Sequence, residues 1–155
     1  MISTPINVTG LLLRLGVGLI FLFSGLQKVL PGTAATVAYF SDLGIPWPGL
    51  LGPFVSYLEL FGAVLLTMGL LTRLVSALFF CEMLVALLVV RIPIAADADS
   101  VADAFAAVRL EVLIAIVASC LVLLGGGRWS LDSVARRARH HSEADDAIVA
   151  QHRGT

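Results

Sequence analysis

The sequence has little charge, little cysteine and no histidine in its apolar part. Only 14% of its 155 residues are charged, against roughly 25% in an ordinary soluble domain, which argues against a soluble monomer. Ten Lys and Arg residues stand against eleven Asp and Glu residues, so no basic excess points to nucleic acid. Cys81 and Cys120 are too few for a disulfide scaffold. The histidines begin at His140, in the polar tail, so we expect no haem or metal site in the apolar part of the chain.

Apolar residues make up most of what is there. The hydrophobic set accounts for 59% of the chain, and the mean hydropathy is +0.98. A helix needs about 20 mostly apolar residues to cross a hydrocarbon core of about 30 Å. Segments of this kind lie at about 9–30, 54–71, 72–92 and 108–124. We therefore predict an all-α membrane protein, a four-transmembrane-helix bundle within residues 1–132, followed by a polar, disordered tail in residues 133–155.

The cations near the ends of these spans predict their orientation. Four spans place both termini on one side, and the side richer in Lys and Arg is the cytoplasmic one. The terminal side carries Arg73, Arg128, Arg136, Arg137 and Arg139. The opposite side carries Lys28, Arg91 and Arg109. We therefore expect both termini to be cytoplasmic.

Ionisable side chains interrupt the predicted spans. Glu59, Glu82 and Glu111 lie in the second, third and fourth spans, where an ionisable group costs roughly 2.5–3.5 kcal/mol and usually faces a partner inside the bundle. At helical rise, Glu59 and Glu111 fall near the outer ends of their helices and Glu82 near the midplane. These three acids are the candidate catalytic residues. With the cations expected beside them, the candidate polar cluster consists of Arg14, Lys28, Glu59, Glu82, Arg109 and Glu111.

Helical spacing gives three of the spans an inward face of small and polar residues. Residues three or four apart share a face of a helix, and glycines on that face allow backbones to approach closely. In the first span the face carries Arg14, Gly18, Phe21, Gly25 and Lys28. In the second it carries Glu59, Gly62, Leu66 and Gly69, and in the fourth Glu111, Ala115, Ala118 and Val122.

Three interpretations of the polar cluster remain open. Carboxylate–cation pairs can fix the register of packed helices and do nothing else. The cluster can instead be a proton-linked or quinone-linked site, because a carboxyl next to a cation in apolar surroundings can titrate during turnover. Ionisable groups also cluster in carriers of small solutes. No cofactor motif of the chain's own is evident, and a quinone is the cofactor that the second interpretation allows.

The first outer loop and the two cysteines also have two explanations each. Aromatic and proline residues in the loop, among them Tyr39, Phe40 and Trp47, favour an interfacial anchor over a binding lid. Cys81 and Cys120 are expected to be small apolar fillers and not a redox pair.

The order of several short motifs resembles the DoxX family of small bacterial membrane proteins. The first motif, in the first span, consists of Arg14, Leu15, Gly18, Phe21, Gly25 and Lys28. It is followed by Gly44-Ile45-Pro46, by Glu59 with Gly62, and by Gly69-Leu70-Leu71-Thr72-Arg73. The closing motif is Gly125-Gly126-Gly127-Arg128-Trp129-Ser130-Leu131-Asp132, in which the family often has proline or alanine at the position of Gly126.

This resemblance implies a multi-pass protein of the bacterial plasma (inner) membrane. It implies an accessory or quinone-contacting subunit of a membrane redox or oxidative-stress assembly, because relatives belong to a thiosulfate:quinone oxidoreductase and to a complex with superoxide dismutase and a sulfurtransferase. The partners expected on this basis are the lipid bilayer, other membrane or soluble redox proteins, and a second copy of the chain. The alternative is a structural anchor for a partner complex, or a small-solute carrier.

Overall fold

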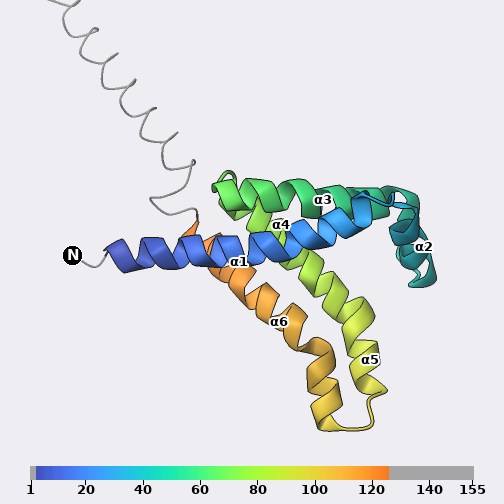
Figure 1. Cartoon of the computed structure of the whole chain (residues 1–155). Helices are drawn as coiled ribbons and strands as arrows, with labels where there is room; N and C mark the ends of the chain where they lie inside the picture. Colours follow the sequence, from blue (N-terminus) through green and yellow to red (C-terminus); the bar gives the residue numbers. More distant parts are fainter. Residues whose placement is uncertain (1–2, 126–155) are drawn as a thin grey trace, which may run out of the picture.

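The computed structural model describes residues 3–125, with side chains from Val8 onward, and this part of the chain contains helices and no strands. The elements are α1 (Ser3–Val29), α2 (Ala34–Asp42), α3 (Pro48–Met68), α4 (Thr72–Ala86), a π-helical segment (Leu87–Arg91), α5 (Ile92–Ala96) and α6 (Val101–Leu124), as drawn in Figure 1. The tail predicted in residues 133–155, and the closing motif after Gly125, lie outside the described residues.

Four of the described helical stretches are long and apolar enough to cross a membrane. They are Val8–Val29, Pro48–Met68, Thr72–Ala96 and Val101–Leu124. The predicted all-helical fold with four spans is therefore confirmed, and the chain is a multi-pass membrane protein.

The boundaries of three spans differ from those expected, for local reasons. The second span begins at Pro48, which is tolerated in the first turn of a helix, and it includes Pro53, after which we expected it to begin. The third continues past Pro93 for the same reason, since Pro93 is the second residue of α5. The fourth begins at Val101, where Ser100 Oγ accepts a hydrogen bond of 3.2 Å from the backbone N–H of Asp103 and caps the helix.

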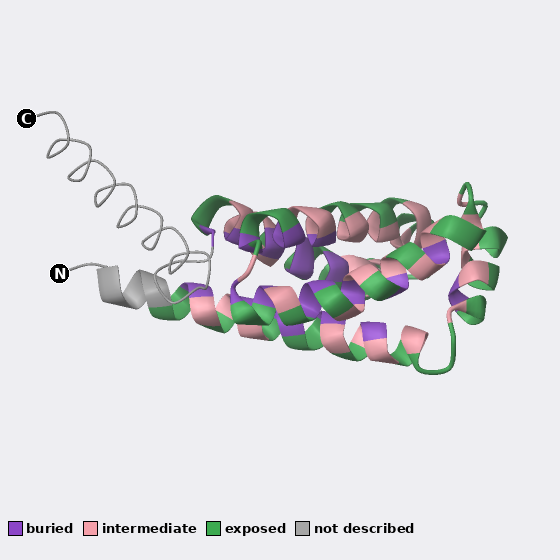
Figure 2. Ribbon diagram, turned by 90° about the horizontal axis from the view of Figure 1, so that it is seen from above, coloured by how far each residue is buried: buried purple, intermediate pink, exposed green. Residues whose placement is uncertain are grey.

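The spans are arranged as two helix pairs. α1 packs along α3, and α4 packs along α6. In Figure 1 the pairs meet near the first residues of α4 and the last residues of α6, and they diverge toward the end that carries α2 and α5. The view from above in Figure 2 shows the long helices running alongside one another, with α2 across one end. The pairs thus form a wedge that opens toward α2 and α5.

The buried core lies where the two pairs meet. The rings of Phe21 and Phe79 are stacked, with centroids 3.7 Å apart and planes inclined by 9°. Gly62 lies against this stack, because a Cβ atom on it would be 2.9 Å from the Phe79 ring. Other members of the core are Val17, Ala63, Leu66, Val75, Ile114 and Leu121.

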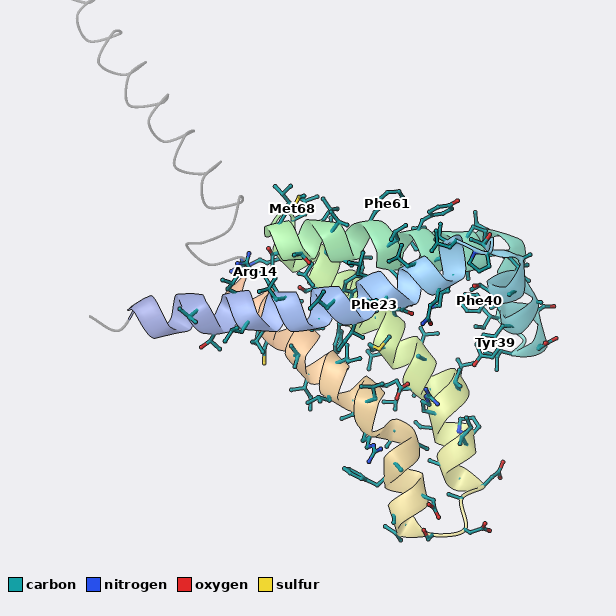
Figure 3. The ribbon with its side chains drawn as sticks, viewed as in Figure 1. Arg14, Phe23, Tyr39, Phe40, Phe61 and Met68 are labelled. Carbon is teal, nitrogen blue, oxygen red and sulfur yellow. The ribbon has the colours of Figure 1, made fainter. Side chains whose placement is uncertain are left out.

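The predicted inward faces are the faces that the structure buries. In α1 this holds for Arg14, Gly18, Phe21 and Gly25, with Lys28 half-buried. In α3 it holds for Glu59, Gly62 and Leu66 and for the C-cap residue Gly69, and in α6 for Glu111, Ala115 and Ala118, whereas Val122 is only partly buried. The outward faces are apolar: Phe23 and Phe61 are exposed and project from α1 and α3, as Figure 3 shows, which suits contact with lipid.

Candidate functional site

A cavity of about 500 Å³ lies in the open part of the wedge. Residues from both helix pairs line it, and α2 contributes Tyr39 and Phe40, which project from that short helix in Figure 3. Most of the lining is apolar, including Phe54, Leu58 and Val89. The charged residues of the lining are Lys28, Glu59, Glu82, Arg91 and Glu111. The cavity therefore combines apolar walls with three acids and two cations.

The first ion pair joins the two helices of one pair. Lys28 Nζ of α1 lies 2.5 Å from Glu59 Oε1 of α3. The Lys28 side chain is 32% exposed and that of Glu59 only 3%. Gly25, one turn before Lys28, makes this contact possible, because a Cβ atom there would be 2.5 Å from the backbone nitrogen of Leu60. The close approach of α1 to α3 thus brings the ammonium group onto the buried carboxylate.

A second carboxyl faces the first from the other helix pair. Glu82 of α4 is partly buried, and its carboxyl lies within hydrogen-bonding reach of that of Glu59. Lys28, which pairs with Glu59, lines the same cavity as Glu82. Among the described residues, no hydrogen-bond donor reaches the buried Oε2 atom of Glu59 or of Glu82. Two carboxyl groups and one ammonium group therefore meet at this wall of the cavity.

The second ion pair joins the helices of the other pair. Arg91 Nε, at the end of the π-helical segment, lies 2.6 Å from Glu111 Oε1 of α6. Glu111 is buried, whereas the Arg91 side chain is 38% exposed. A π-helical turn changes which face of a helix its later residues occupy, and such turns are frequent at functional sites. Arg91 is the last residue of this π-helical segment and lines the cavity.

Two residues of the expected cluster lie elsewhere. Arg14 is 1% exposed, donates from Nε to the carbonyl oxygen of Gly10 at 3.3 Å, and does not line the cavity. It lies four helical turns, about 21 Å, from Lys28 along α1. Arg109 is exposed and is not part of the lining. Arg91 occupies the place beside Glu111 that we expected Arg109 to take.

Sequence reasoning also separated two acids that the structure brings together. Glu59 was counted from the outer end of its helix and Glu82 from Arg73 at the other end, so the two acids were assigned to different depths. Counted from the tight turn that their helices share, between Met68 and Thr72, they lie about 14 Å and about 15 Å along antiparallel helices, and so at the same level. The turn was visible in the sequence, and counting from it would have paired the two acids.

The first outer loop and the cysteines also differ from the simplest expectation. The loop contains α2, and its Tyr39 and Phe40 line the cavity, so this segment covers the wedge as well as lying at one end of it. Both cysteines are free. Cys81 is exposed and lines the cavity, so it is not a buried filler, whereas Cys120 is partly buried. Within the described part of the chain, no group of three His, Cys, Asp or Glu residues could hold a metal ion.

The fold and the site define a multi-pass helical membrane protein with a charged cavity between two helix pairs. The chain belongs to the DoxX family, whose model matches residues 10–92. It is 35% identical over 82 residues to a protein of Bacillus subtilis (strain 168) named "Putative oxidoreductase CatD". The match covers 53% of this chain and 59% of that relative, so the chain spans well under two thirds of the relative's length. No solved structure matches the chain.

Proposed function

We propose that this chain is a membrane subunit of a redox assembly and that its cavity holds the headgroup of a lipid-soluble quinone. The observation that carries the proposal is the cavity itself, whose volume of about 500 Å³ lies within the roughly 300–1,000 Å³ of small-molecule sites. The proposal places the protein in the bacterial inner membrane with both termini in the cytoplasm, as the distribution of cations favours.

The residues of the cavity suit such a headgroup. Phe40, Phe54 and Leu58 offer apolar surface to a planar ring, and the wedge lies within spans that lipid surrounds. Lys28 can donate a hydrogen bond to a carbonyl oxygen, and the carboxyl groups of Glu59 and Glu82 lie in the same lining. A bound quinone would supply two-electron, two-proton redox chemistry. The chain's own residues would orient the headgroup and exclude water from it.

The relative named as an oxidoreductase supports a redox role in a general way. That name describes the Bacillus subtilis protein, and family likeness is an associational argument for this chain. The sequence contains no dinucleotide-binding fingerprint. Electrons would therefore come from, or go to, a membrane or soluble redox partner.

A second candidate, a structural anchor for such a partner, has one observation in its favour. The pair Lys28–Glu59 joins α1 to α3, and the pair Arg91–Glu111 joins the third span to α6. Each ion pair therefore lies within one helix pair, where it would fix the register of the two helices. An anchor would need the ion pairs and would have no use for the cavity.

The test is to purify the chain in lipid nanodiscs and to extract and weigh its bound small molecules. The proposal predicts about one quinone per chain in the wild type and a loss of at least fivefold in Glu82→Gln and Lys28→Met. Arg109→Gln, which alters an exposed cation outside the cavity, is the matched control and should keep the quinone. Wild-type protein without quinone, in complex with a soluble redox enzyme, would instead make the chain an anchor.

A further inference from the structure

The contact between Glu59 and Glu82 differs from both ion pairs because it lacks a hydrogen-bond donor. Glu59 Oε1 accepts from Lys28, while the Oε2 atoms of both acids are buried and receive no donor from the described residues. Two ionised carboxylates are acceptors only, so they cannot satisfy each other. A proton on one of the two carboxyls would supply the donor that the contact lacks.

Charged and titratable groups surround the contact on several of the elements that line the cavity. Lys28 faces it from α1, and Arg91 and Glu111 face it from the π-helical segment and α6. The uncharged titratable groups of the lining are Tyr39 of α2 and Cys81 of α4. Arg91 and Glu111 neutralise each other at 2.6 Å. One ammonium group is therefore left for two carboxyl groups.

Ionising both carboxyls would place two negative charges in contact inside a membrane span. Like charges held together in a medium of low polarity repel strongly, and such pairs avoid this by sharing one proton. Because the ammonium group of Lys28 is paired with Glu59, the proton belongs on Glu82. We propose that Glu59 and Glu82 form a proton-binding site in the wall of the cavity, with Glu82 as the group that holds the proton.

This site narrows the class of ligand that the cavity takes. A protonated carboxyl donates a hydrogen bond, so the wall would favour a ligand with an oxygen acceptor that gains or loses a proton in its reaction. A quinone carbonyl has this property, and only this statement about the ligand rests on the proposed function. The proton itself would be bound whether or not a quinone is present.

The experiment uses N,N′-dicyclohexylcarbodiimide, an apolar reagent that reacts with protonated carboxyls inside membranes. The full chain in nanodiscs is treated with it, and adducts are counted by intact-mass and peptide mass spectrometry. We expect one adduct per chain at neutral pH, on Glu82, and at least a fivefold loss of labelling as the pH is raised. Arg109→Gln, which alters an exposed cation outside the cavity, is the matched control and should be labelled like the wild type.

The variant Glu59→Gln separates a shared proton from a merely buried acid. Without Glu59, Lys28 would pair with Glu82, so Glu82 would ionise and labelling should fall at least fivefold. Labelling of Glu82 that persists in folded Glu59→Gln would overturn the sharing. If the wild type formed no adduct, the proposed proton-binding site would be overturned by that result alone.

A short-chain soluble quinone, added before the reagent, tests the link to the proposed function separately. Protection of Glu82 by the quinone would support that link. Labelling that quinone does not reduce would overturn the link and leave the proton-binding site standing.

Discussion

The two ends of the wedge contrast in how they are filled. Where the helix pairs meet, Phe21, Phe79, Leu66 and Leu121 are almost completely buried against one another; we call this region the packed half. Toward α2 and α5 the pairs diverge around about 500 Å³ of space and five charged residues; we call this region the cavity half. The same four spans thus build both a dense core and a hollow lined with charge.

This contrast teaches which part of the chain holds the fold and which part is available for function. Association of helices in lipid depends on close packing, because lipid tails are as apolar as the side chains themselves. Charges and unfilled space work against that packing. In this chain the charges and the unfilled space both lie in the cavity half, and the packed half is dense. Such departures from good packing are expected at functional sites.

The largest expected effect is on the packed half. Phe79→Ala would remove one ring of the Phe21–Phe79 stack and leave a void, at a cost of about 3–5 kcal/mol in the free energy of unfolding. The measurement is unfolding by SDS titration in mixed micelles. Phe61→Ala, on the exposed face of α3, is the control and should cost much less. Equal losses in the two variants would contradict a packed half.

The next effect is at the boundary between the halves. Gly25→Ala would place a methyl group 2.5 Å from the backbone nitrogen of Leu60, so α1 and α3 would have to separate. We expect a loss of about 1–3 kcal/mol in unfolding free energy, as overpacking typically costs. Gly16→Ala is the control, because nothing lies within 4 Å of a Cβ atom there.

A smaller effect is expected from the cation of the cavity half. Lys28→Met would leave the buried Glu59 carboxylate without its donor, at a cost of about 1–3 kcal/mol. The double variant Lys28→Met/Glu59→Gln removes both charges and should recover most of the loss. If the double variant were less stable than Lys28→Met, loss of the ion pair would not explain the lower stability of Lys28→Met.

The smallest effect is expected from the half-exposed partner of the second ion pair. Arg91→Gln removes the charge of Arg91 but keeps a side-chain N–H donor, so it should cost only about 0.2–1 kcal/mol. Thermal unfolding in nanodiscs would measure this difference. Arg109→Gln should change nothing, and a larger loss in Arg109→Gln than in Arg91→Gln would mean that the two cations have been assigned to the wrong positions.

The packed half could be predicted from the sequence more completely than the cavity half. Helical spacing alone placed Phe21, Gly62 and Ala118 on inward faces, because a period of 3.6 residues fixes which side chains share a face. Four apolar stretches of sufficient length gave the four spans. These are properties of single helices, and the structure confirms them.

The cavity half depends on how different helices are placed, which no single helix specifies. Arg91 reaches Glu111 from the end of a π-helical turn, which no sequence pattern predicted. Arg109, on the same helix as Glu111, is exposed and does not line the cavity. We expected a loop where α2 lies, because prolines come before and after its nine residues. The divergence of the two pairs, and hence the cavity, follows from packing between helices and could not be derived from spacing.

Labelling with a photoreactive azidoquinone would test whether the cavity half binds a quinone. The chain in nanodiscs is irradiated with the probe, and the labelled residues are mapped by mass spectrometry. We predict labels on lining residues such as Phe40, Phe54 and Val89, and loss of these labels when an excess of unlabelled quinone competes. Labels spread over lipid-facing residues such as Phe23 and Phe61, without competition, would contradict the account.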